Sequence, residues 1–136
     1  MNNKFSQIIL CELSELLLMK KILIIDDEYQ NREMLSDFLE IKGYEVITAN
    51  DGADGLEIFK NNETDAAIID IKMPIMNGIE CATEMRKIQE NFPIIMITGH
   101  VDIDYKLHIK NMGLDHLLIK PLNINEIDEI LQSFFN

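Results

Sequence analysis

Cysteine and proline are scarce in this sequence, and tryptophan is absent. The two cysteines, Cys11 and Cys81, have neither a CxxC partner nor a spaced histidine, which argues against a disulfide framework and against a zinc site. We expect both to be reduced and to act as small apolar packing residues. No apolar run approaches the roughly 20 residues that span a bilayer, so no transmembrane segment is predicted.

Basic residues are also few: the chain has 12 lysines and arginines and 24 acidic residues, which gives a formal charge of -12. Such a chain repels nucleic acid and anionic membranes, so we expect neither as a direct partner. It suits a cation or a basic protein surface instead. The 136 residues, 47% of them hydrophobic, are enough for one compact domain with a full core, and the cysteine usage favours a cytoplasmic setting.

Residues 1–18 precede this domain, which we place at residues 19–136. Apolar side chains recur at helical spacing over residues 5–18 and predict an amphipathic helix. Acidic residues interrupt the apolar part and no cleavage pattern follows, so a signal peptide is not indicated. Two interpretations stay open: a helix that packs on the domain or on a partner, or an extension upstream of a native start at Met19.

From residue 21 onward, strand and helix patterns alternate five times. Short apolar runs bounded by turn residues predict strands at residues 22–25, 45–49, 66–69, 94–97 and 117–119. Helical patterns follow them at about residues 30–42, 53–61, 78–91, 103–112 and 124–135. This alternation with short connections predicts an α/β fold, with a parallel sheet covered by helices on both faces.

Polar residues follow four of the predicted strands: Asp26, Asp27, Asp70, Thr98 and Lys120. Alone, each has an ordinary explanation, since acidic residues suit helix N-termini and a lysine before proline is often solvated. Ligands of an open parallel sheet, however, bind at the carboxyl ends of its strands. Because all five residues share that edge, we expect them to form one site.

Three carboxylates at one edge offer the oxygen ligands that Mg²⁺ prefers. An aspartate can also attack phosphorus and form an aspartyl-phosphate, provided that the repulsion between carboxylate and phosphate is neutralised. The metal and Lys120 would supply positive charge, and Thr98 would donate a hydrogen bond to a phosphoryl oxygen. The residues therefore predict phosphoryl transfer to an aspartate.

From about Met19 onward the sequence resembles the receiver domain of two-component response regulators. The resemblance rests on residues 25–28, 70–78, 97–99 and 118–122, which read IDDE, DIKMPIMNG, ITG and LIKPL. The spacings agree, with 43 residues from Asp27 to Asp70, 28 on to Thr98 and 22 on to Lys120. The resemblance implies a flavodoxin-like (βα)5 doubly wound fold, with a five-stranded parallel sheet in the order 2-1-3-4-5.

The resemblance also implies roles for the site residues. Asp70 becomes the phosphoacceptor, Asp27 and Asp70 ligate Mg²⁺ directly, and Asp26 acts through metal-bound water. The backbone carbonyl of Lys72 adds a ligand, Thr98 binds the phosphoryl group, and Lys120 pairs with it. The Lys120-Pro121 bond is expected to be cis.

A stand-alone receiver is the function that this resemblance implies. A histidine kinase or histidine phosphotransfer protein donates the phosphoryl group, and the modified domain contacts a protein target through residues 103–112, 117–119 and 124–135. Such a domain promotes its own phosphorylation and dephosphorylation and is not an enzyme acting on a separate substrate.

One position departs from the receiver pattern. Receivers commonly carry an aromatic residue three positions before the lysine, where this chain has Leu117, so the usual coupling to Thr98 is in question. His116 is expected to point to the opposite side of the strand. By resemblance, Lys72 and His100 tune the lifetime of the phosphoryl group.

Three alternatives remain. A haloacid dehalogenase-type phosphatase expects an Asp-x-Asp pair, which neither Asp26-Asp27 nor Asp70-Ile71-Lys72 supplies. A flavodoxin needs a Ser/Thr-rich phosphate loop after the first strand, where the acidic residues would repel flavin phosphate. A receiver-like domain that acts only by protein interaction is compatible with the same residues.

Overall fold

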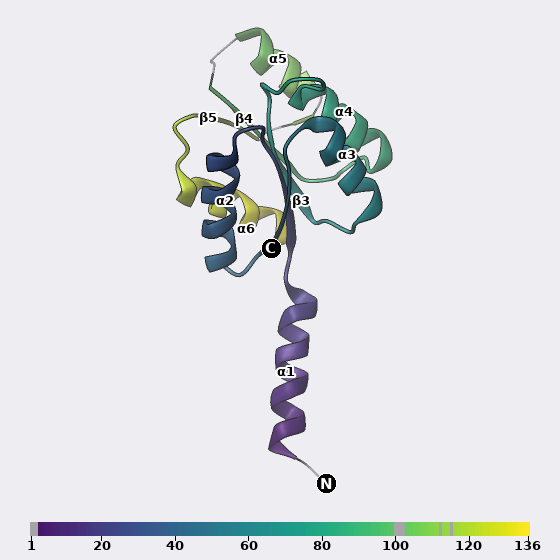
Figure 1. The fold of residues 1–136 in the computed structure, drawn as a ribbon, viewed down its shortest axis with the longest axis vertical. Helices are drawn as coiled ribbons and strands as arrows, with labels where there is room; N and C mark the ends of the chain where they lie inside the picture. Colours follow the sequence, from purple (N-terminus) through teal and green to yellow (C-terminus); the bar gives the residue numbers. More distant parts are fainter. Residues whose placement is uncertain (1–2, 100–102, 112, 115) are drawn as a thin grey trace.

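A computed structural model describes residues 3–99, 103–111, 113–114 and 116–136 of the chain (Figure 1). The strands are β1 (Lys21–Ile25), β2 (Glu45–Ala49), β3 (Ala66–Asp70), β4 (Ile94–Thr98) and β5 (His116–Ile119). The helices are α1 (Lys4–Leu18), α2 (Tyr29–Ile41), α3 (Gly52–Asn61), α4 (Gly78–Ile88), α5 (Ile103–Asn111) and α6 (Ile124–Phe135).

The five strands form one parallel sheet in the order β2-β1-β3-β4-β5. This is the predicted flavodoxin-like order, and the predicted strands agree with the observed ones to within one residue at each end. Every residue of β3 and β4 is buried, because helices cover both faces of the sheet. Up to their last residues, the sequences of these two strands are therefore continuous apolar runs and do not alternate between apolar and polar residues.

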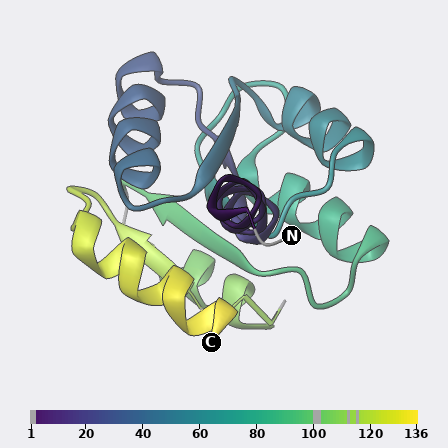
Figure 2. The same cartoon turned by 90° about the horizontal axis from the view of Figure 1, so that it is seen from below.

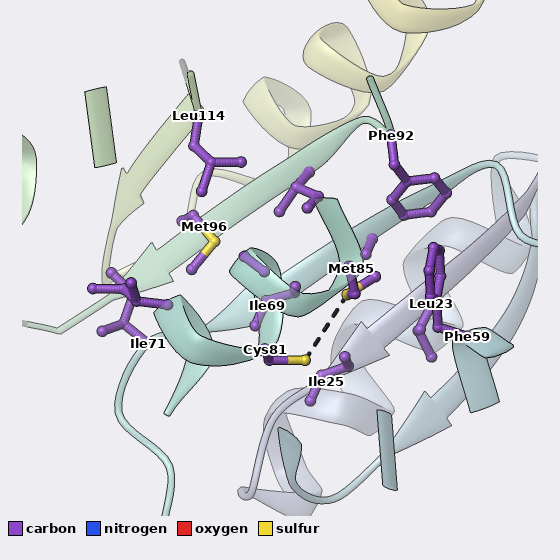
Figure 3. Packing of buried hydrophobic residues seen from close by; sticks show 14 of the residues in the cluster. Leu23, Ile25, Phe59, Ile69, Ile71, Cys81, Met85, Phe92, Met96 and Leu114 are labelled. Carbon is purple, nitrogen blue, oxygen red and sulfur yellow. Dashed lines mark hydrogen bonds between the residues drawn. The ribbon is translucent and has the colours of Figure 1, made fainter. Parts of the chain in front are cut away.

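Alternation along each strand divides the core into two layers. Leu23 and Ile25 point toward α3 and α4, where they join a cluster that includes Cys81 and Met85 of α4 (Figure 3). Ile22 and Ile24 point to the other face and pack with residues of α2 and α6. Figure 2 shows the helices on the two sides of the sheet, with α1 seen end-on between them.

The helix α4 ends at Ile88, three residues before the predicted end at Asn91. The chain turns after Gln89, whose backbone carbonyl accepts a hydrogen bond from the Phe92 amide at 3.2 Å. This turn carries Phe92 into the core, where its ring lies 4.8 Å from that of Phe59. Burial of the Phe92 ring stabilises the fold more than one further turn of α4 would.

The N-terminal helix α1 projects away from the sheet along the long axis of the molecule (Figure 1). Its described apolar side chains are largely exposed, among them Phe5 and Leu17. Cys11 is exposed as well, so the prediction that it acts as a small apolar packing residue is wrong, whereas Cys81 is buried as predicted. The reason is that α1 lies outside the core. Among the described residues, no helix is long and apolar enough to cross a membrane.

Candidate functional site

The predicted site residues meet at the carboxyl edge of the sheet. Asp26 directly follows β1, while Asp70 and Thr98 are the last residues of β3 and β4. All three are buried, with exposed fractions of 2%, 3% and 2%. Carboxylate oxygens of Asp26, Asp27 and Asp70 lie within 4.8 Å of one another, so the structure brings the three acidic groups together as the sequence predicts.

Lys120 supplies positive charge to this group. Its Nζ lies 3.2 Å from Asp70 Oδ2 and donates a hydrogen bond to it, and its backbone amide donates to the Thr98 carbonyl at 2.8 Å. Burial lowers the pKa of Lys120, but the charges of Asp70 and Asp26 more than offset this and leave the pKa raised overall. The ammonium therefore stays charged. The Lys120-Pro121 bond is cis, as predicted.

Asp26 is fixed by its own backbone and by the start of α2. Its Oδ1 accepts a hydrogen bond from the Glu28 amide at 2.9 Å, and its carbonyl accepts one from Arg32 Nη1 at 2.7 Å. Burial raises the pKa of the Asp26 carboxyl; the Glu28 bond opposes this, and the nearby Asp70 charge raises it further. The single positive charge of Lys120 does not offset the negative charges of the three neighbouring carboxylates, and a bound cation would relieve the remaining repulsion between them.

Sequence reasoning did not identify Arg32. A signal existed, because a cation in the first turn of a helix is unfavourable to the helix dipole and calls for a compensating contact. That contact is the Asp26 carbonyl, one residue beyond β1.

The loop after β3 holds Asp70 from the other side. The Lys72 amide donates to Asp70 Oδ1 at 3.2 Å, and the Gly78 amide donates to the Ile71 carbonyl at 2.9 Å. Between them, the Met76 amide donates to the Pro74 carbonyl at 2.8 Å across Ile75, whose φ is 71°. This is the geometry of a strained γ-turn, with a β-branched residue at its centre.

Leu117 and His116 lie on opposite sides of β5, as predicted. Leu117 packs against the core cluster on the α3 and α4 side, whereas the His116 ring lies 5.1 Å from that of Phe134 on α6. Leu117 also lines a hollow of about 290 Å³, together with Lys106 and Lys110 of α5. His100 lies outside the described residues, and the lifetime role of Lys72 stays a prediction.

The donor set of the site fits a hard divalent cation. Three carboxylates converge, two of them buried, and the residues offer only oxygen ligands and one ammonium. A thiolate or imidazole, which zinc prefers, is absent from this group. Asp26, Asp27 and Asp70 are therefore the residues that would hold Mg²⁺.

Comparisons with known proteins agree with this geometry. A sequence model of the response regulator receiver domain matches residues 22–132. The chain is 36% identical over 114 residues to the probable transcriptional regulator ycf27 of Porphyridium aerugineum, covering 84% of this chain and 47% of that protein. It is 32% identical over 115 residues to sporulation initiation phosphotransferase F of Bacillus subtilis, covering 85% of this chain and 93% of that protein.

Among solved structures, the response regulator protein TrrA of Thermotoga maritima in complex with Mg²⁺-BeF superposes with a TM-score of 0.77 at 34% identity, covering 85% of this chain and 99% of that one. The chain spans about half the length or less of several curated relatives that it matches. The match to the family model nevertheless covers nearly all of the sheet and its helices. The chain belongs to the family of response regulator receiver domains.

Proposed function

We propose that this chain is a stand-alone receiver in which Asp70 accepts a phosphoryl group from a histidine kinase or a histidine phosphotransfer protein in the cytoplasm. The observation that carries the proposal is the buried Asp70 carboxylate, paired with Lys120 at 3.2 Å and grouped with Asp26 and Asp27. The match to sporulation initiation phosphotransferase F, over 93% of that protein, supports a receiver that acts without an attached output domain. In this proposal residues 19–136 form the receiver and residues 1–18 an extension.

In the transfer step, a carboxylate oxygen of Asp70 attacks phosphorus. An oxygen–phosphorus bond forms, and the nitrogen–phosphorus bond of the donor phosphohistidine breaks, leaving its electron pair on the imidazole, which takes up a proton. Lys120 offsets negative charge beside the attacking carboxylate, and the Thr98 hydroxyl donates to a phosphoryl oxygen. Bound Mg²⁺, held by Asp26, Asp27, Asp70 and the Lys72 carbonyl, would neutralise the charge of the phosphoryl oxygens.

The output is a change in protein binding. Phosphorylation adds about -1.5 to -2 charges beside Lys120 and Thr98, which biases the loops at the carboxyl edge between two arrangements. The protein target would contact α5, β5 and α6. Because the chain carries a charge of -12, neither nucleic acid nor an anionic membrane is the proposed partner.

Intact-mass measurement tests the proposal directly. With Mg²⁺ and acetyl phosphate or a cognate kinase, the protein should gain one phosphoryl group, and Asp70→Asn should gain none. Asp37→Asn, which changes an exposed aspartate of α2 in the same way, should be modified like the wild type.

Two outcomes would support other functions. No adduct from any donor would favour the domain that acts only by protein interaction. Rapid turnover of a generic phosphate ester that Asp70→Asn abolishes would favour the phosphatase.

A further inference from the structure

The helix α1 carries an exposed apolar surface that no other described element covers. We call Phe5, Ile8, Ile9, Leu10, Leu13, Leu17 and Leu18 the α1 surface; each of these residues is between 48% and 85% exposed. A lone helix of 15 residues is only marginally stable in water. The seven residues occupy most of the circumference of the helix, so a partner helix covers only those on the side that it faces; about 400 Å² buried per helix on that side approaches, for a pair, the 1,000 Å² expected of a specific interface.

A groove at the base of α1 continues this surface onto the domain. It has a volume of about 940 Å³, and its lining includes Leu18, Met19, Tyr44 and Phe135. Lys20 and Lys42 also line it, but each ammonium already lies over an aromatic ring, at 5.3 Å from the centroid of Phe135 and 5.5 Å from that of Phe38. Glu12, Asp128, Gln132 and Asn136 also line the groove, so its lining is mixed, with Tyr44 and Phe135 as the aromatic residues that an aromatic side chain could contact.

The charges on and around α1 argue against a lipid surface as the occupant. Helices that lie on membranes carry lysine and arginine on their polar face. Here the only basic residue of α1 is Lys4, against Glu12 and Glu15, and the whole chain carries a charge of -12. An anionic bilayer would repel it.

We propose that α1 pairs with α1 of a second copy in antiparallel orientation, with Phe5 of each copy seated in the groove at the base of the other. On the side where the helices meet, apolar residues of the two α1 surfaces cover each other, and the exposed Phe5 at the tip meets Tyr44 and Phe135 in the groove. The Lys4 of each copy then approaches the end where Glu12 lines the groove.

Electrostatic repulsion between the domains selects the antiparallel orientation. A helix of 15 residues is about 22 Å long, so antiparallel pairing holds the two acidic domains apart by more than two Debye lengths at physiological salt. Parallel pairing would place both domains at the same end. The pairing does not depend on phosphorylation of Asp70.

Sedimentation equilibrium of the full chain tests the pairing. The wild type should form dimers, and Leu13→Glu and Phe5→Glu should each raise the dissociation constant by at least about tenfold, because each places a charge in the apolar contact. Ile41→Glu makes the same kind of change at an exposed position of α2, outside the α1 surface and the groove. This control variant should change the dissociation constant by less than about twofold. Far-UV circular dichroism confirms that each variant is folded.

Cross-linking tests the orientation, in a Cys11→Ser background. One variant carries Ser6→Cys, and a second carries Gln132→Cys at a residue that lines the groove. A short bismaleimide should cross-link these two variants when they are mixed, and should not cross-link either variant alone. Cross-links between two Ser6→Cys copies instead would overturn the antiparallel arrangement. A protein that stays monomeric at about 1 mM, or that instead binds phosphatidylcholine vesicles, would overturn the pairing itself.

Discussion

The backbone of Gly78 packs directly against the carbonyl group of Asp70: a Cβ at position 78 would lie 2.8 Å from both the Asp70 carbonyl carbon and Ile71 Cα. Backbone cannot move aside as a flexible side chain can. We therefore expect Gly78→Ala to lower the free energy of unfolding by about 1–3 kcal/mol. Gly99→Ala, where a Cβ meets nothing within 4 Å, is the matched control, and equal losses in urea titrations of both variants would contradict the prediction.

Lys120→Ala should tighten Mg²⁺ binding while it impairs phosphorylation. The ammonium lies 3.2 Å from Asp70 Oδ2, where it competes electrostatically with a metal ion held by the same carboxylates. Removal of one positive charge at this range should raise Mg²⁺ affinity by about tenfold, as measured by isothermal titration calorimetry. Lys87→Ala, in an exposed pair with Glu84, should leave the affinity unchanged. Weaker binding in Lys120→Ala would refute this account of the site.

Stability should fall at alkaline pH because of Tyr44. Burial, and then the charge and hydrogen bond of Asp128, raise the Tyr44 pKa to about 12, above the value of about 10 in the unfolded chain. Between these values the folded state holds more protons than the unfolded state, so the free energy of unfolding decreases as pH rises from about 10 to 12. Urea titrations should show a smaller decrease in Tyr44→Phe. An equal decrease would assign the effect to other groups.

Ile75→Gly should stabilise the protein. The side chain of Ile75 is 86% exposed and packs little, while its φ of 71° is unfavourable for a β-branched residue. Relief of this strain, less the entropy that glycine adds to the unfolded chain, should raise the free energy of unfolding by about 1 kcal/mol. Ile75→Ala removes the same exposed surface but keeps the Cβ, so thermal unfolding should show a smaller gain. A loss of stability in the glycine variant would show that the turn is unstrained.

The sheet and the acidic site were predictable because both follow from short-range pattern. Buried parallel strands appear as continuous apolar runs, and the polar residue that ends each run identifies the shared edge. Contacts between distant segments have no such signal. The Tyr44 hydroxyl donates to an Asp128 carboxylate 84 residues away, and the tight approach of Gly78 to Asp70 depends on a loop conformation rather than on composition. The exposure of Cys11 depends on where α1 lies, which its amphipathic pattern does not specify.

The strand β1 begins beside the groove at the base of α1, and Asp26 directly follows its last residue, Ile25. Its five residues extend about 17 Å, so the groove and the acidic site lie at opposite ends of one strand. A paired molecule would therefore keep both of its acidic sites open. A target with two binding surfaces could engage both at once and gain avidity from the linkage alone, without any stronger contact at either site.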